Sequence, residues 1–217
     1  MSHVFFEPFV GKYYQTEGYA GKKLLILGES HYCDKKYAQT SECENENECL
    51  QLAECQKFTK DVAERFLKYK QQKAPYESWM RTWTTFTNVF LGGQASIDEL
   101  LDFWDRVVFY NYVQTPTEHS RISPAEHAFD DSKNAFFEVL EEYKPDLMIV
   151  WGARLEERLP VENKTLSDFK ILDTPGHVFH YYDVAGKKIP AYAIYHPSST
   201  AFGYKYHEYL QEAFRLA

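Results

Sequence analysis

The chain has 217 residues and a formal net charge of −8 at pH 7. That charge argues against a protein that binds nucleic acid over its whole surface, because such proteins are usually basic. Its hydrophobic content of 44% and charged content of 26% are ordinary for a globular protein. No apolar stretch is long enough to cross a membrane, and no signal region follows Met1, so we expect a soluble, cytoplasmic protein.

The first half of the chain alternates between strand and helix signals. An apolar run predicts a strand from Lys23 to Gly28. Apolar residues at helical spacing then predict helices over Thr59 to Lys70 and over Ser96 to Trp104. A second run, rich in valine and aromatic residues, predicts a strand from Arg106 to Tyr112.

The second half continues the alternation. A cap region at Asp131-Ser132 precedes a predicted helix over Ala135 to Tyr143, which Pro145 ends. Three further elements follow: a strand from Asp146 to Gly152, a strand from Ala191 to His196 and a helix over His207 to Leu216. The pair Ala185-Gly186 predicts a hairpin between Val178 to Tyr182 and Ile189 to Tyr195.

Strands separated by helices predict a parallel sheet with right-handed crossovers. We therefore predict an α/β fold, a three-layer α/β/α sandwich around a central, mainly parallel four-stranded sheet. The hairpin adds an antiparallel piece at one edge of that sheet. We expect a single domain over residues 1–217, with a cysteine-containing insertion at about 33–57.

Two polar, turn-forming segments follow predicted strands at opposite ends of the chain. Gly28-Glu29-Ser30-His31-Tyr32 follows the first strand, and His196-Pro197-Ser198-Ser199-Thr200 follows the last. In open α/β sheets the ligand lies beyond the carboxyl ends of the strands. These two loops are therefore predicted to line one cleft, and an enzyme is the first hypothesis.

Two further motifs end the strands between them: Asn111 and the pair Trp151-Gly152. In this order the four motifs resemble those of the uracil-DNA glycosylase superfamily. Its branches carry a first motif such as Gly-Gln-Asp-Pro-Tyr or Gly-Glu-Ala-Pro-Gly, an Asn ending a middle strand, a Trp-Gly or similar pair and a terminal His-Pro-Ser. The resemblance implies a DNA-repair glycosylase that flips a uracil or another damaged base from DNA and hydrolyses its N-glycosidic bond.

The resemblance also implies roles for individual residues. His196 is the expected donor to a carbonyl of the departing base, and Asn111 reads the edge of that base. Tyr32 closes off the C5 position, and Gly28 lets the backbone approach the ligand closely. Ser198 is expected to contact a backbone phosphate, together with main-chain N–H groups of the following turn.

Three positions depart from the superfamily pattern. Ser30 stands where the most active branch has an Asp that positions water and steadies the cationic sugar, and serine carries no negative charge. His31 replaces the usual Pro, and both Glu29 and His31 are candidate substitutes for the Asp. Thr200 lies at the expected apolar wedge, whose role passes to one of two nearby aromatic side chains, Phe202 or Tyr204.

Plainer interpretations stay open beside this one. His196 is also typical of a hydrogen-bonded structural residue, Asn111 of a strand-end cap, and Tyr32 of a core residue. Ser30 and the acidic net charge favour an alternative function: a non-catalytic protein that binds a nucleotide or nucleic acid on the same fold.

All four cysteines lie within one short segment, at Cys33, Cys43, Cys49 and Cys55. Clustered cysteines in a protein without a secretory signal favour metal binding over disulfides. Four thiolates suit either zinc or a [4Fe–4S] cluster, and their spacing does not separate the two. The alternative is four unrelated reduced thiols.

Overall fold

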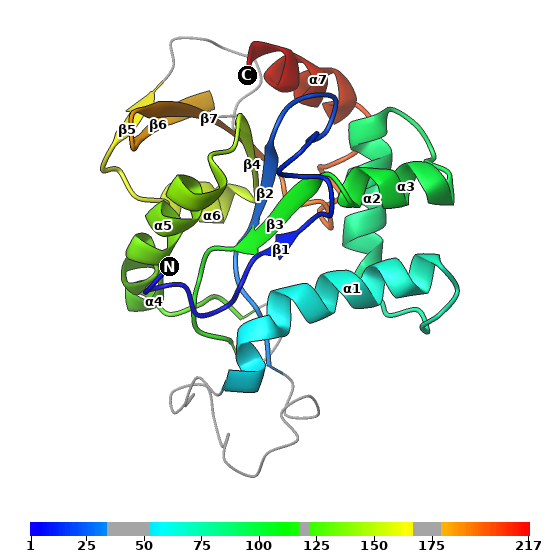
Figure 1. The fold of residues 1–217 in the computed structure, drawn as a ribbon, viewed down its shortest axis with the longest axis horizontal. Helices are drawn as coiled ribbons and strands as arrows, with labels where there is room; N and C mark the ends of the chain where they lie inside the picture. The colour runs from blue at the N-terminus through cyan, green and yellow to red at the C-terminus, as the bar shows by residue number, and fades with distance from the viewer. Residues whose placement is uncertain (34–52, 118–121, 167–178) are drawn as a thin grey trace.

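A computed structural model of the chain describes residues 1–33, 53–117, 122–166 and 179–217. Within these residues a sheet of seven strands has the order β1-β3-β2-β4-β7-β6-β5 (Figure 1). The strands β3, β2, β4 and β7 are parallel, whereas β1 and the pair β6 and β5 are antiparallel to their neighbours. Their bounds are β1 Phe9–Val10, β2 Leu24–Gly28, β3 Val107–Asn111, β4 Leu147–Trp151, β5 Lys164–Leu166, β6 Phe179–Val184 and β7 Lys187–Ile194.

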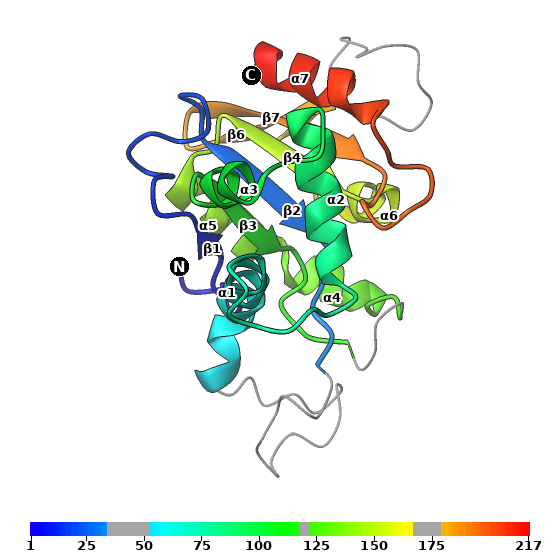
Figure 2. The same ribbon diagram turned by 90° about the vertical axis from the view of Figure 1, so that its right-hand side faces the viewer.

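Helices cover both faces of the sheet (Figures 1 and 2). Side chains of α1, α2, α3 and α7 pack on one face, and those of α4, α5 and α6 pack on the other. The bounds are η2 Ala53–Lys57 (a 3-10 helix), α1 Phe58–Lys70, α2 Met80–Leu91, α3 Ile97–Trp104, α4 Glu126–Asp131, α5 Lys133–Tyr143, α6 Ala153–Arg158 and α7 Tyr206–Leu216.

The central strands are apolar along their whole length because both of their faces are covered. Every residue of β2, β3 and β4 is buried. Along β2, Leu24 and Ile26 join the core beneath α1, α2, α3 and α7, whereas Leu25 and Leu27 join the core beneath α4, α5 and α6. The two cores therefore follow from the two-residue period of a strand.

The predicted α/β class is confirmed, but the predicted four-stranded sheet is wrong. The four predicted strands form the parallel centre, and the hairpin at Ala185-Gly186 extends the sheet as β6 and β7. The strands β1 and β5 were not predicted, since two and three residues are too short to show a period. The first predicted hairpin residue, Val178, lies outside the described residues.

Four predicted helices correspond to α1, α3, α5 and α7, whereas α2, α4 and α6 were not predicted. The longest of the three, α2, contains several threonines, which are weak helix formers. Its apolar side chains nevertheless recur at helical spacing, at Trp83, Phe86 and Phe90. Gly92 ends it with a φ of 83°, a conformation that favours glycine.

The connections around β2 fix where a ligand is expected. The chain leaves β2 through α1, α2 and α3 on one face to reach β3, and returns through α4 and α5 on the other face to β4. The connections therefore diverge between β2 and β4, and ligands of open α/β sheets bind beyond the carboxyl ends of strands at such a switch point.

In the described part of the chain, no helix has the length and apolar character needed to span a bilayer.

Candidate functional site at the carboxyl edge of the sheet

Strand register brings the four motifs to one edge of the sheet. Gly28 pairs with Asn111 across β2 and β3, and Trp151 pairs with Ile194 across β4 and β7. The residues that follow these strands are Glu29, Gly152 and Tyr195-His196, so they leave the same edge. Neighbouring strands lie about 4.8 Å apart, so motifs distant in sequence become neighbours in space.

The first motif continues to pair with the chain beyond β3. The backbone N–H groups of Tyr112 and Val113 donate to the carbonyls of Gly28 (2.9 Å) and Glu29 (2.8 Å). The N–H of Thr117 donates to the carbonyl of His31 at 2.8 Å. The loop is therefore held by a ladder of backbone hydrogen bonds.

Gly28 makes room for the amide of Asn111. A Cβ at position 28 would lie 2.1 Å from Asn111 Oδ1 and 3.1 Å from the ring of Phe109. Any side chain there would displace the amide from its place above β2. The sequence predicted a close approach of the Gly28 backbone to a ligand, and in the structure the group in close contact with Gly28 is the amide of Asn111.

His31 faces the interior of the protein and holds the other side of the same amide. Its ring is buried, packed edge-on against Phe6 and Phe58. Asn111 Nδ2 lies 3.0 Å from Nδ1 of His31, and Thr59 Oγ1 lies 2.8 Å from Nε2. Burial lowers the pKa of His31 to about 3, so the ring is neutral. Asn111 Nδ2 also lies 3.2 Å from Nε2, so the amide nitrogen packs against the imidazole close to both ring nitrogens.

His196 is exposed, and its hydrogen bonds determine its tautomer. Ser198 Oγ lies 2.7 Å from Nδ1, and the backbone N–H of Ser198 donates to the same nitrogen at 3.3 Å. A backbone N–H only donates, so Nδ1 is an acceptor and the proton of the neutral ring is on Nε2. Desolvation by the surrounding protein lowers the pKa of His196, while Glu29 acts to raise it and Arg154 to lower it.

An ion pair joins the first motif to the helix after β4. Arg154 donates through Nε to Glu29 Oε2 at 2.7 Å, and through Nη2 to Glu29 Oε1. Gly152 begins α6 with a φ of 114°, a conformation that only glycine adopts easily. The sequence reasoning missed Arg154, whose only signal was its position two residues after Trp151-Gly152.

The remaining predicted residues lie at the same edge with different exposures. Tyr32 is 40% exposed, so its interpretation as a core residue is wrong. Ser30 is half-buried, and Ser198 and Thr200 are exposed. Of the two candidate wedges, Phe202 is buried against Tyr206 with ring centroids 4.9 Å apart, whereas Tyr204 is exposed.

The cysteine prediction is only partly covered by the described residues. Cys33 and Cys55 are half-buried, whereas Cys43 and Cys49 lie outside the described residues, as does most of the predicted insertion at about 33–57. Among the residues that the structure describes, no cluster of three or more metal-binding side chains occurs. Zinc or iron–sulfur binding therefore stays a prediction.

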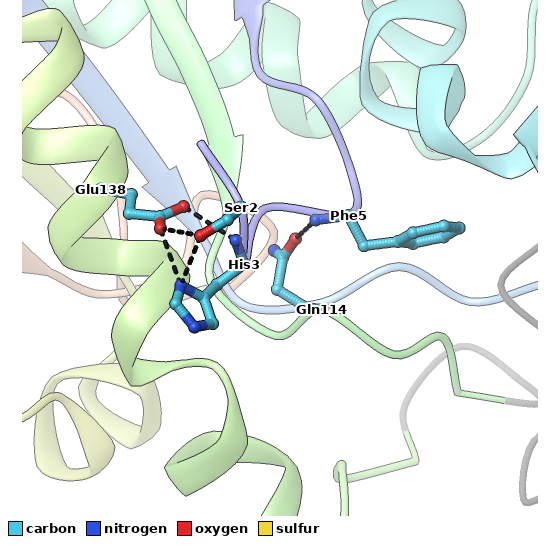
Figure 3. Close-up of polar contacts among 5 residues, drawn as sticks. All are labelled: Ser2, His3, Phe5, Gln114 and Glu138. Carbon is cyan, nitrogen blue, oxygen red and sulfur yellow. Dashed lines mark hydrogen bonds and ion pairs between the residues drawn. The ribbon is translucent and has the colours of Figure 1, made fainter.

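The N-terminal segment is hydrogen-bonded to Gln114, which follows β3, and to Glu138 of α5 (Figure 3). The backbone N–H groups of Phe5 and Phe6 donate to Gln114 Oε1, both at 2.9 Å, and Gln114 Nε2 donates to the carbonyl of Asn111.

Ser2, His3 and Glu138 resemble a catalytic triad in composition only. Ser2 Oγ (3.2 Å) and Glu138 Oε1 (2.7 Å) both contact Nδ1 of His3, whereas a triad needs them on opposite ring nitrogens.

A surface hollow of about 480 Å³ opens elsewhere, beside β1 and α1, and none of the motif residues lines it.

No family model and no curated protein sequence matches the chain. The carboxyl edge of the sheet offers the polar groups described above. It combines a neutral imidazole donor, an oriented amide and a carboxylate paired with a guanidinium.

Proposed function

We propose that the carboxyl edge binds an extruded nucleobase and hydrolyses its N-glycosidic bond. The observation that carries the proposal is the backbone N–H of Ser198 at Nδ1 of His196, which leaves the proton of the neutral ring on Nε2. The resemblance to the uracil-DNA glycosylase superfamily assigns this position to a donor that stabilises the departing base. As part of the same proposal, we infer that the α/β fold is a three-layer α/β/α sandwich of the kind found in that superfamily.

In the proposed reaction the bond between C1′ and the base nitrogen breaks, and its electron pair leaves with the base. Negative charge then develops on a base carbonyl oxygen, where the Nε2–H of His196 donates. A preorganised donor of this kind contributes about 3–4 kcal/mol to transition-state stabilisation. Water adds to C1′ and loses a proton, which the departing base anion takes up, so the products are an abasic sugar and the neutral free base.

Glu29 supplies the negative charge that Ser30 lacks. The sugar becomes cationic as the base leaves, and a nearby carboxylate stabilises that charge. Glu29 directly follows β2, and its influence on the pKa of His196 supports a position near the reacting groups. We assign Ser30, with its neutral hydroxyl, to binding the attacking water.

Asn111 reads the base in this proposal, with Gly28 and His31 as its supports. The amide is fixed between the backbone of Gly28 and the ring of His31. His31, predicted in the loop that lines the cleft as a substitute for the missing Asp, has its ring enclosed by Phe6 and Phe58, and Asn111 is buried beside it. We therefore assign it to positioning Asn111. Tyr32 and Thr200, both exposed at the edge, remain candidates for lining the base pocket.

One observation favours the second candidate, a protein that binds a nucleotide or nucleic acid without cleaving it. Both carboxylate oxygens of Glu29 accept from Arg154, which offsets part of the charge needed at the sugar. The two candidates share one surface and differ only in turnover.

A cleavage assay separates them. Single- and double-stranded oligonucleotides carrying uracil, mismatched thymine, hypoxanthine or modified cytosines are incubated with the wild type and with His196→Ala. We expect abasic-site formation on at least one substrate, reduced about 100-fold or more in the variant. The matched control is His127→Ala, on the exposed surface of α4, which should keep full activity.

Two results contradict the glycosylase proposal. Cleavage that survives in His196→Ala removes the role assigned to that residue. No cleavage of any substrate by the wild type, at high protein concentration, favours the binding function instead.

A further inference from the structure

The guanidinium of Arg154 is held in a fixed orientation at the edge. Glu29 accepts from Nε and from Nη2, so the carboxylate occupies one side of the planar group. The Arg154 side chain is 52% exposed, whereas that of Glu29 is only 14% exposed. A partly buried carboxylate thus anchors a guanidinium that faces solvent.

One pair of donors stays unused. A guanidinium has five N–H groups, which form two forks: one from Nε and Nη2, the other from Nη1 and Nη2. Glu29 takes the first fork. Within the part of the chain that the structure describes, the second fork has no partner, and its two parallel N–H groups match two oxygens of a phosphate.

We propose that Arg154 binds a phosphate group of the ligand through this second fork, with Glu29 as the residue that positions it. The inference rests on the proposed function for the identity of the site, and it names the part of the substrate that Arg154 recognises. It predicts a ligand with a phosphate, either a nucleic-acid strand or a mononucleotide, in preference to a free nucleoside.

Two observations support a phosphate contact at this position. Arg154 lies at the start of α6, just after β4, and is bound to Glu29, just after β2, so the guanidinium lies at the same edge of the sheet as His196. Ser198, the residue first predicted to bind a phosphate, directs its hydroxyl to Nδ1 of His196 at 2.7 Å. That hydroxyl cannot donate to His196 and to a phosphate at once, so another donor is needed.

Binding to a fluorescein-labelled single-stranded oligonucleotide tests the proposal, measured by anisotropy over a range of salt concentrations. We expect Arg154→Gln to weaken binding about tenfold or more, as for loss of a charged hydrogen bond. The slope of log K against log salt should fall by roughly 0.7, which corresponds to one phosphate of a single strand. Arg154→Lys should restore the slope but only part of the affinity, because lysine keeps the charge and loses the fork.

The matched control is Arg158→Gln. Arg158 lies on the same helix, is similarly exposed and pairs with Glu126. We expect its affinity and salt slope to equal those of the wild type. Competition with a nucleotide monophosphate and with the corresponding nucleoside then identifies the phosphate source. If the monophosphate displaces the labelled oligonucleotide from the wild type far better than from Arg154→Gln, the phosphate is a terminal one. If only unlabelled oligonucleotide displaces it, the phosphate belongs to a strand.

Equal binding by wild type and Arg154→Gln overturns the proposal, as does an equal loss in Arg158→Gln. A nucleoside that displaces the labelled oligonucleotide as effectively as its monophosphate does also overturns it. These results are distinct from failure of the glycosylase proposal. Arg154-dependent binding without any cleavage would retain the phosphate contact and reject only the reaction.

Discussion

The short helix α6 takes part in two ionic clusters that differ in their surroundings. Arg154, near its start, pairs with Glu29 at the carboxyl edge, and the arginine is half exposed. Glu156, two residues later, faces the sheet and accepts from Lys164 Nζ at 2.6 Å, with His180 Nδ1 3.4 Å from the same oxygen. In this buried cluster the side chains of Glu156, Lys164 and His180 are 9%, 12% and 0% exposed.

Only one of the two clusters is open enough to bind a ligand. The buried cluster is sealed, and it leaves Glu156 Oε2 and both ring nitrogens of His180 without a hydrogen-bond partner among the described residues. Burial raises the pKa of Glu156, against the effect of Lys164, and lowers the pKa of His180 to about 3. The exposed pair has unused donors in contact with solvent. Substitutions should therefore affect stability in the buried cluster of Glu156, and ligand binding at the exposed pair of Arg154 and Glu29.

The largest effect is expected for Glu156→Gln. It leaves the ammonium of Lys164 largely buried without a counter-charge, and breaking a buried ion pair in this way costs about 3–5 kcal/mol. For a chain of this size the corresponding fall in Tm is roughly 6–20 °C. Thermal unfolding at pH 7 measures it. Glu157→Gln, one residue along on the exposed side of α6, should change Tm little. Similar Tm values for the two variants would show that the cluster contributes nothing to stability.

The next effect is the dependence of stability on pH at His180. Its folded pKa of about 3 lies below the usual 6.5, so the unfolded chain binds a proton that the folded chain does not. Stability is therefore fully present above pH 6.5 and is lost as the pH falls toward 3. Between pH 6.5 and 5 the loss is about 2 kcal/mol for this histidine.

Urea unfolding of the wild type and of His180→Leu at both pH values measures this loss. We expect the variant to lose less stability than the wild type on acidification, while His127→Gln on the exposed surface keeps the wild-type dependence. An identical dependence in His180→Leu would mean that His180 titrates normally in the folded protein.

The sequence predicted the centre of the fold well, because the buried parallel strands are long apolar runs with clear ends. It also predicted that Asn111 and His196 lie at one edge, since Asn111 ends β3 and His196 follows β7, and both strands belong to the parallel centre of the sheet. It could not predict the inward rotation of His31, which depends on Phe6 and Phe58 packing against the ring.

Arg154 and the buried cluster were missed for a related reason. Glu29 and Arg154 are 125 residues apart in the chain, and no local pattern links them. Glu156, Lys164 and His180 come from α6, β5 and β6, which become neighbours only when β6 and β5 extend the sheet. Periodicity predicts which face of an element is apolar, but it does not predict which polar groups meet across elements.

The smallest effect on stability is expected at the exposed pair, where the protonation of His196 is the sensitive measurement. Glu29 acts to raise the pKa of His196, and Arg154 acts to lower it. Glu29→Gln should therefore lower that pKa and Arg154→Gln should raise it, while either change alters the free energy of unfolding by about 1 kcal/mol or less because Arg154 is exposed. NMR titration of the His196 ring measures both shifts. Arg158→Gln should leave the ring unchanged, because Arg158 pairs with Glu126 instead. Shifts of the same sign in the two variants would contradict opposite charges acting on one imidazole, and an unshifted ring would separate the ion pair from the chemistry proposed for the edge.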